Sequence, residues 1–186
     1  MTRFEYLTVL DSIVVALGIT EVTFSWARLI QNRERVKFSG LHSFWSAFAL
    51  LLMVQFWWSF WNYRVIEDWS LFWLMTVVLE SIVLVICALM LTPSRSFTGE
   101  IDLEQHYYRN ARPFFLFGAV LMVQLSVGDT LILGGLSVFH QENLVRGTGA
   151  VIAATLAWSS SRRLHRAFPY IASILFAIFL LNAIML

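Results

Sequence analysis

The sequence contains a single cysteine, Cys87, and it lies inside an apolar run. A disulfide framework and a cysteine zinc site each need at least a second cysteine, so both are excluded. We interpret Cys87 as a small buried hydrophobic residue, because a reactive thiol needs a polar, accessible setting.

Charge is also scarce. Only 13% of the 186 residues are charged, whereas 59% are hydrophobic, and the mean hydropathy is +0.71. The formal net charge of +1 gives no general attraction for nucleic acid or for an acidic substrate. A soluble domain of this length does not need so apolar a composition, so we predict an integral membrane protein with the lipid bilayer as its first partner.

Known catalytic and cofactor motifs are missing. We find no Gly-x-Ser-x-Gly turn, no His-Glu-x-x-His pair and no phosphate-binding loop. The only lysine, Lys37, lies in a predicted loop, which excludes a retinal Schiff base. The histidines all map to loops or span ends, which argues against paired haem ligands within the membrane; they are His42, His106, His140 and His165. We therefore predict no cofactor and no enzymatic activity.

Six apolar runs are long enough to approach the roughly twenty residues that a membrane-spanning helix needs. We predict an all-α protein, a single domain over residues 1–186, with spans at residues 4–30, 41–63, 69–91, 113–136, 146–160 and 168–186. The first run is too long, and too interrupted by Asp11 and Glu21, to be a cleaved signal peptide. Residues 94–112 form the only sizeable polar segment, which we predict to be a cytoplasmic surface helix with Tyr107 and Tyr108 at the headgroups.

The basic residues predict the orientation, because short cytoplasmic loops retain Lys and Arg. Ten of the thirteen fall after spans one, three and five: Arg28, Arg33, Arg35, Lys37, Arg95, Arg109, Arg112, Arg162, Arg163 and Arg166. Both termini are then on the outer, periplasmic side. The short loops and the lack of a signal peptide favour a bacterial plasma (inner) membrane.

The chain shows an internal repeat at an offset of 69 residues. Leu10-Asp11-Ser12-Ile13-Val14 returns as Leu79-Glu80-Ser81-Ile82-Val83, and Leu52-Met53-Val54-Gln55 returns as Leu121-Met122-Val123-Gln124. Two matches at one offset indicate a duplicated two-helix hairpin. The last two spans are either a third, decayed copy or an unrelated hairpin.

Four carboxyl residues lie within the predicted spans, namely Asp11, Glu21, Glu80 and Asp129, and no Lys or Arg lies in the middle of any span. A charge at the bilayer centre costs about 2.5–3.5 kcal/mol on the lenient insertion scale. Each acid must therefore be protonated, hydrogen-bonded, hydrated or balanced by a mobile cation. Their predicted depths form a series from the outer to the inner side of the membrane.

Helical spacing places amides and hydroxyls on the same faces as these acids. We predict an ion or proton pathway of Asp11, Glu80, Gln55, Gln124, Glu21 and Asp129, with supporting polar residues Ser12, Ser81, Ser59, Asn62, Ser25 and Arg28. The polar faces of odd and even helices are expected to meet inside the bundle. The structural alternative is that each protonated acid only bonds a neighbouring helix, and for Glu21 the favoured role is an ion pair with Arg28.

These patterns favour a channel or transporter for protons or small cations. We expect a homo-oligomer, because one small bundle has little room for an aqueous path and the Gly149, Ala153, Ala157 stripe suits contact between helices. The alternative is a scaffold or sensor subunit whose basic loops bind a partner or anionic lipid.

Overall fold

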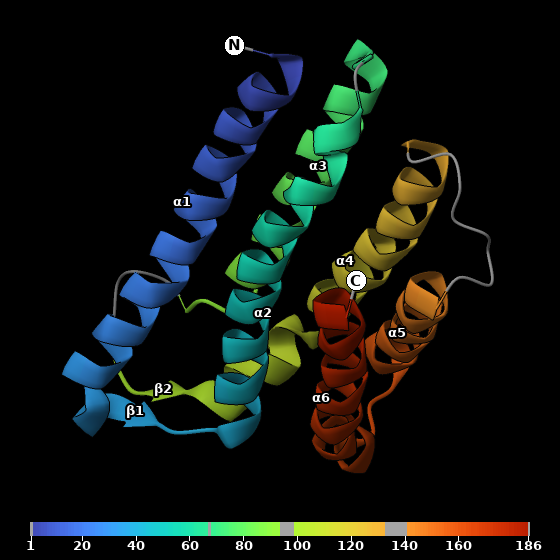
Figure 1. The fold of residues 1–186 in the computed structure, drawn as a ribbon. Coiled ribbons are helices and arrows are strands. Elements are labelled where there is room, and N and C mark those ends of the chain that lie inside the picture. The colour runs from blue at the N-terminus through green and yellow to red at the C-terminus, as the bar shows by residue number, and fades with distance from the viewer. Residues whose placement is uncertain (1, 67, 94–98, 133–140, 186) are drawn as a thin grey trace.

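A computed structural model describes residues 2–66, 68–93, 99–132 and 141–185. In these ranges six α-helices follow one another (Figure 1): α1 (Arg3–Gln31), α2 (Gly40–Ser59), α3 (Leu71–Leu89), α4 (Leu103–Ile132), α5 (Gln141–Trp158) and α6 (Arg162–Met185). Short 3-10 helices follow α1 (η1, Arg33–Arg35) and α2 (η2, Phe60–Val65), and the two-residue strands β1 (Val36–Lys37) and β2 (Ile101–Asp102) complete the elements. The prediction of an all-α fold class is confirmed, since the two short strands are the exception among the described elements.

Five of these helices are long and apolar enough to cross a membrane: α1, α2 with η2, α3, α4 and α6. Helix α5 is not among them. It has 18 residues and carries Glu142 and Arg146 in its first two turns. The chain is therefore a helical protein with several candidate membrane spans, and the sixth span stays a prediction.

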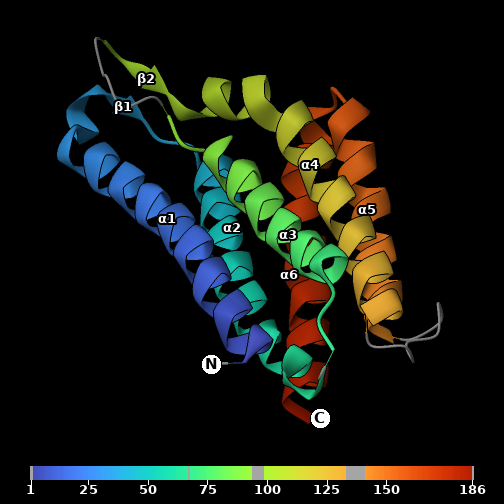
Figure 2. The same cartoon turned by 90° about the horizontal axis from the view of Figure 1, so that it is seen from above.

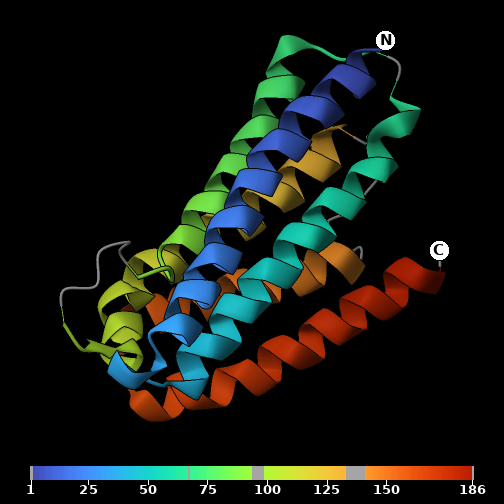
Figure 3. The ribbon, with the colours of Figure 1, turned by 90° about the vertical axis from the view of Figure 1, so that its left-hand side faces the viewer.

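Successive helices run in opposite directions, so both termini lie at one end of the bundle and the β1–β2 pair lies at the other (Figures 2 and 3). Helix α3 packs between α1 and α4, and α4 makes its most extensive contact with α5. The strands pair in parallel, Val36 with Ile101 and Lys37 with Asp102. This pairing ties the connection after α1 to the connection that precedes α4.

The predicted surface helix in residues 94–112 is not a separate element. Residues 94–98 lie outside the described part, and from Leu103 the chain is already in α4, which continues through Pro113. Leu103, Tyr107 and Ala111 are buried at four-residue intervals and form one apolar stripe. The Tyr107 hydroxyl bonds His165 Nδ1 at 2.8 Å, so the prediction that Tyr107 rests on lipid headgroups is wrong.

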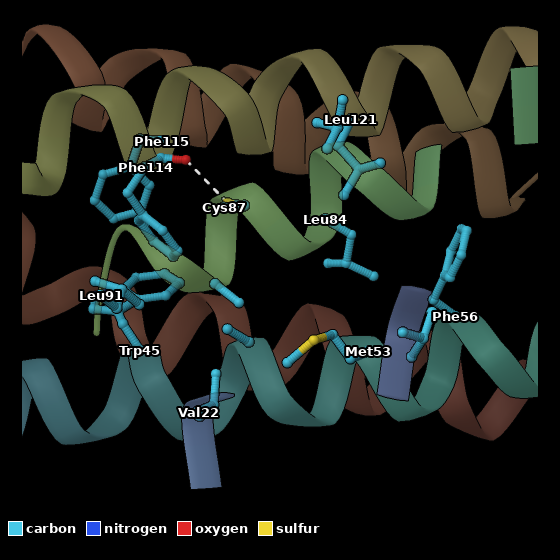
Figure 4. Packing of buried hydrophobic residues seen from close by; sticks show 14 of the residues in the cluster. Val22, Trp45, Met53, Phe56, Leu84, Cys87, Leu91, Phe114, Phe115 and Leu121 are labelled. Atoms are coloured by element: carbon cyan, nitrogen blue, oxygen red, sulfur yellow. Dashed lines mark hydrogen bonds between the residues drawn. The ribbon is translucent and has the colours of Figure 1, made fainter. Parts of the chain in front are cut away.

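Aromatic rings fill the core near the β1–β2 end. The Trp45 ring packs edge-on against Phe114 and Phe115, with centroids 5.8 Å and 5.0 Å away. Cys87 is buried and donates its thiol proton to the Phe114 carbonyl at 3.2 Å (Figure 4). The interpretation of Cys87 as a buried core residue is confirmed.

Gly18 lets α1 approach α2 and α3 closely. A Cβ added there would lie 2.7 Å from Val85 Cγ2 and 2.9 Å from Met53 Sδ. We expect Gly18→Ala to be destabilising, because overpacking costs about 1–3 kcal/mol and only about 1 kcal/mol returns from the better helix propensity of alanine. Thermal unfolding in detergent measures the change.

The matched control is Gly149→Ala in α5, where the new Cβ would meet Met122 at ordinary distances, 3.8 Å from Sδ and 3.9 Å from Cγ. That variant should be neutral or more stable, by up to about 1 kcal/mol. Equal effects of the two substitutions would contradict the close approach at Gly18.

Asp102 caps α4 and pairs with Lys37 at the exposed end of the bundle. Its carboxylate accepts from the backbone N–H groups of Glu104 and Gln105 at 2.9 Å and 3.0 Å, and the Lys37 ammonium lies 2.7 Å away. The Lys37 hydrogen bond and the backbone N–H groups hold the pKa of Asp102 below its ordinary value, and the pair raises the pKa of Lys37.

Because the folded pKa of Asp102 is lowered, its stabilising contribution is complete above the unfolded pKa, about 3.9, and is lost as the pH falls through the folded pKa. We expect Lys37→Gln to raise the pKa of Asp102 toward that unfolded value. An NMR titration of the Asp102 carboxyl measures it, and an unchanged pKa would contradict the pairing.

Candidate functional site

Asp11 and Glu80 are buried where α1 packs on α3. Asp11 belongs to the buried stripe of α1 that also contains Leu7, Val15 and Gly18, with a spacing of three or four residues. The Asp11 side chain has 0% relative exposure and Glu80 has 1%. These predicted site residues are therefore shielded from lipid and from solvent.

No described group donates a hydrogen bond of good geometry to either carboxyl group: both oxygens of Asp11 and both oxygens of Glu80 are buried without one. Ser81 lies within hydrogen-bonding reach of Asp11, but its hydroxyl donates to the Val78 carbonyl at 2.8 Å. The Ser81 oxygen can still accept a hydrogen bond from a neutral, protonated Asp11.

Asp129, by contrast, is fully paired. Arg146 Nη1 lies 2.5 Å from Asp129 Oδ2, and the Tyr63 hydroxyl donates to the other carboxylate oxygen. Arg146 also donates to the Leu125 carbonyl at 3.4 Å and lies 3.6 Å from Glu142. Asp129 is thus held by groups from η2 and α5.

Arg146 is the first residue of the fifth predicted span, at its outer edge. In the structure Arg146 lies in the second turn of α5, and its side chain is 11% exposed. Because α5 packs along α4, Arg146 returns to the level of Asp129, 17 positions earlier in the chain. A hairpin with an acid before its turn and an arginine after it is a sequence signal that could have identified the pair.

Glu80 connects the unpaired and the paired acids. It interacts electrostatically with Asp129, Arg146 and Asp11. Its Oε1 lies so close to α4 that a Cβ at Gly128 would be 2.7 Å from it. Glycine at position 128 therefore makes room for the Glu80 carboxyl group.

The two amides take different places. Gln124 Nε2 in α4 donates to the Thr76 carbonyl in α3 at 3.4 Å, one turn before Glu80. Gln55 and Ser59 in α2 instead line a cavity that reaches Arg146, and the described lining includes neither Asp11 nor Glu80. The expected meeting of polar faces is seen between α3 and α4, but α2 does not bring Gln55 to the acids.

The remaining predicted residues lie outside the cluster. Glu21 pairs with Arg28 at 3.3 Å, as expected of that acid. It is ten residues from Asp11, about 15 Å along the helix. Asp11 and Asp129 each interact with Glu80, while Glu21 lies apart along α1. The predicted series of acids from the outer to the inner side stays a prediction.

The predicted supporting hydroxyls and amide have local roles. Ser12 donates to the Thr8 carbonyl and accepts from Trp57 Nε1 at 3.0 Å. Ser25 is buried on the same face as Asp11, and Asn62 is exposed.

The histidines form two further contacts at the β1–β2 end. The His42 and His106 rings meet edge-on at 5.8 Å, and His42 Nε2 bonds the Leu91 carbonyl at 2.7 Å. His165 is buried between the Tyr107 hydroxyl and the Ser159 carbonyl, and His140 lies outside the described residues. Within the described ranges no three His, Cys, Asp or Glu side chains gather as a metal site.

Comparison with protein-family models, with curated proteins and with solved structures finds no match to this chain. The class of protein is therefore defined by the fold and the site alone. It is a helical protein with several candidate membrane spans and a buried cluster of acids between α1, α3 and α4.

Proposed function

We propose that the protein conducts protons or small cations across a membrane, with Asp11 and Glu80 as the exchanging groups. The observation that carries this proposal is the pair of fully buried carboxyl groups whose four oxygens have no partner among the described residues. Such groups are stable inside a membrane protein only when they hold a proton or a cation.

The charge balance of the cluster supports the proposal. Glu80 and Asp129 both interact with the Arg146 guanidinium, which already pairs with Asp129 and Glu142. Two acids are left without a fixed positive charge. A proton or a metal cation can bind them and leave again without breaking an existing hydrogen bond.

In this mechanism the cation or proton passes between Asp11 on α1 and Glu80 on α3, which interact electrostatically. The Ser81 oxygen, close to Asp11, supplies a neutral ligand. Asp129 is already bound to Arg146 and Tyr63, so it does not carry the proton or cation. It influences Glu80 only through electrostatic repulsion. Gln55 and Glu21 have no direct part in it.

We further propose that the bundle has six spans built from a duplicated hairpin. The register of burial supports the repeat, because buried positions of the first hairpin recur 69 residues later as buried positions of the second. Between α1 and the segment from α3 to Leu91 the matched buried pairs are Asp11 and Glu80, Val15 and Leu84, Gly18 and Cys87, and Val22 and Leu91. Between α2 and α4 they are His42 and Ala111, Trp45 and Phe114, and Ser46 and Phe115. We assign α5 as the sixth span, because the ion pair with Asp129 removes the cost of placing the Arg146 charge within the membrane. A third copy in the last two spans stays a prediction.

The orientation and assembly belong to the same proposal. Exposed arginines gather at the β1–β2 end, which we assign to the cytoplasm, so both termini lie on the periplasmic side of a bacterial inner membrane. The described cavities do not join Asp11 to the surface. A homo-oligomer, or a movement of α1 against α3, is then needed to open the path.

Flux through proteoliposomes tests the function. Purified protein is placed in vesicles that contain a proton-sensitive dye, and gradients of protons, Na⁺ and K⁺ are imposed in turn. We expect flux of at least one of these cations above that of empty vesicles. No flux under any gradient overturns the proposal.

The second candidate is a scaffold or sensor that binds a partner or anionic lipid through its basic end. The observation that favours it is the exposure of the arginine side chains there: Arg33, Arg35, Arg109, Arg112, Arg162, Arg163 and Arg166. It predicts no flux, tolerance of Asp11→Asn and loss of function when these arginines are neutralised.

A further inference from the structure

A cavity of about 190 Å³ lies inside the bundle, apart from the acid pair. Its walls come from α2, α3, α4, α5 and α6 and are mostly aromatic and aliphatic. Trp45, Phe114 and Phe115 close the end near the β1–β2 pair, and Gln55, Ser59 and Arg146 supply the polar groups. An apolar cavity on the order of 150 Å³ is large enough to admit benzene, so this one can hold a hydrocarbon group.

Helix α6 forms the outer wall of this cavity. Ala172, Leu175 and Phe176 line the cavity, while only 11% of the most apolar stretch of α6 is buried. The Phe48 and Phe176 rings meet at 5.4 Å and join α2 to α6. Because the wall of the cavity on this side is a single helix whose other face is exposed, a molecule dissolved in the lipid around α6 can reach the cavity without a path through water.

The polar groups define what the head of such a molecule must be. The side-chain amide of Gln55 is half-buried and has no hydrogen bond to the described residues, so both a donor and an acceptor are open. Arg146 is already neutralised by Asp129 and Glu142. An anionic head would find no spare positive charge and would face two carboxylates, whereas an uncharged oxygen can pair with the Gln55 amide.

We propose that this cavity binds an uncharged amphiphile from the bilayer, with its hydrocarbon part among the aromatic rings and one uncharged oxygen group at Gln55. The inference does not rest on the proposed function, because the cavity lining excludes Asp11 and Glu80.

Two probes of equal chain length test it: 1-octanol, which is uncharged, and octanoate at mildly alkaline pH, which is anionic. Thermal unfolding of the detergent-solubilised chain is followed as each probe is added, since a ligand of the folded state raises Tm with concentration. We expect octanol to raise Tm in a saturable way and octanoate to raise it less. No saturable rise with octanol, or an equal or larger rise with octanoate, overturns the proposal.

Two variants locate the binding. Ala153→Phe fills the cavity from α5 and should abolish the octanol shift, whereas Val151→Phe, on the exposed face of the same helix, should keep it. Gln55→Leu should weaken octanol binding about fivefold, the ratio expected of one ordinary hydrogen bond. An octanol shift that survives Ala153→Phe and Gln55→Leu unchanged places the binding elsewhere and overturns the assignment.

Discussion

Replacing Asp11 by asparagine and Glu80 by glutamine in one chain is expected to abolish proton or cation flux in proteoliposomes. Both substitutions keep the size and most of the shape of the buried side chains, but they remove the groups that can bind and release a proton. Because neither carboxyl group pairs with a described residue, their loss breaks no hydrogen bond that supports the fold. The double variant should therefore stay folded and unfold at the wild-type temperature or above it.

The control for this experiment is Glu34→Gln, which neutralises an exposed acid in η1 at the other end of α1. It should conduct like the wild type. Single variants refine the result, since a path that needs both groups loses flux when either is replaced. Undiminished flux in the double variant rejects Asp11 and Glu80 as the carriers even if the protein conducts.

Replacing Arg146 by leucine is expected to destabilise the protein by about 3–5 kcal/mol, because removing one partner of a buried ion pair leaves the other charge uncompensated. The charge left behind is Asp129, whose carboxylate would keep only the Tyr63 hydroxyl. Chemical or thermal unfolding in detergent measures the loss.

The double variant Arg146→Leu with Asp129→Asn should recover much of this loss, since neither charge then remains. Arg163→Leu, an exposed arginine at the start of α6, is the control and should change stability by less than about 0.5 kcal/mol. If Arg146→Leu behaves like Arg163→Leu, the pair does not hold α4 and α5 together.

The helical elements could be predicted from the sequence because they depend on local patterns. Long apolar runs locate α1, α2, α3 and α6, and the stripe through Asp11 and Gly18 is the face that α1 buries. The unusual acids also stand out, since a carboxyl group within an apolar run has no ordinary reason to be there. Asp11, Glu80 and Asp129 are predicted residues that the structure brings together.

The partners of these acids could not be predicted, because they depend on how separate helices pack. Arg146 stood at the edge of a predicted span, and its pairing with Asp129 follows only from the packing of α5 along α4. Nothing in the sequence indicates that Gly128 lies against Glu80, which is 48 positions earlier. Tyr107 looked like an interfacial residue in a polar segment, yet its ring is buried against His165.

The two-residue pairing of β1 with β2 has a mechanical consequence for the acids. It holds the connection after α1 against the start of α4 at one end of the bundle (Figure 3). At the opposite end Arg3 Nη1 donates to the Trp69 carbonyl at 2.9 Å, just before α3 begins. Helix α1 is therefore fastened at both ends, and Asp11 lies between the two attachments. A movement that brings water to Asp11 has to break one of these attachments or bend the helix between them.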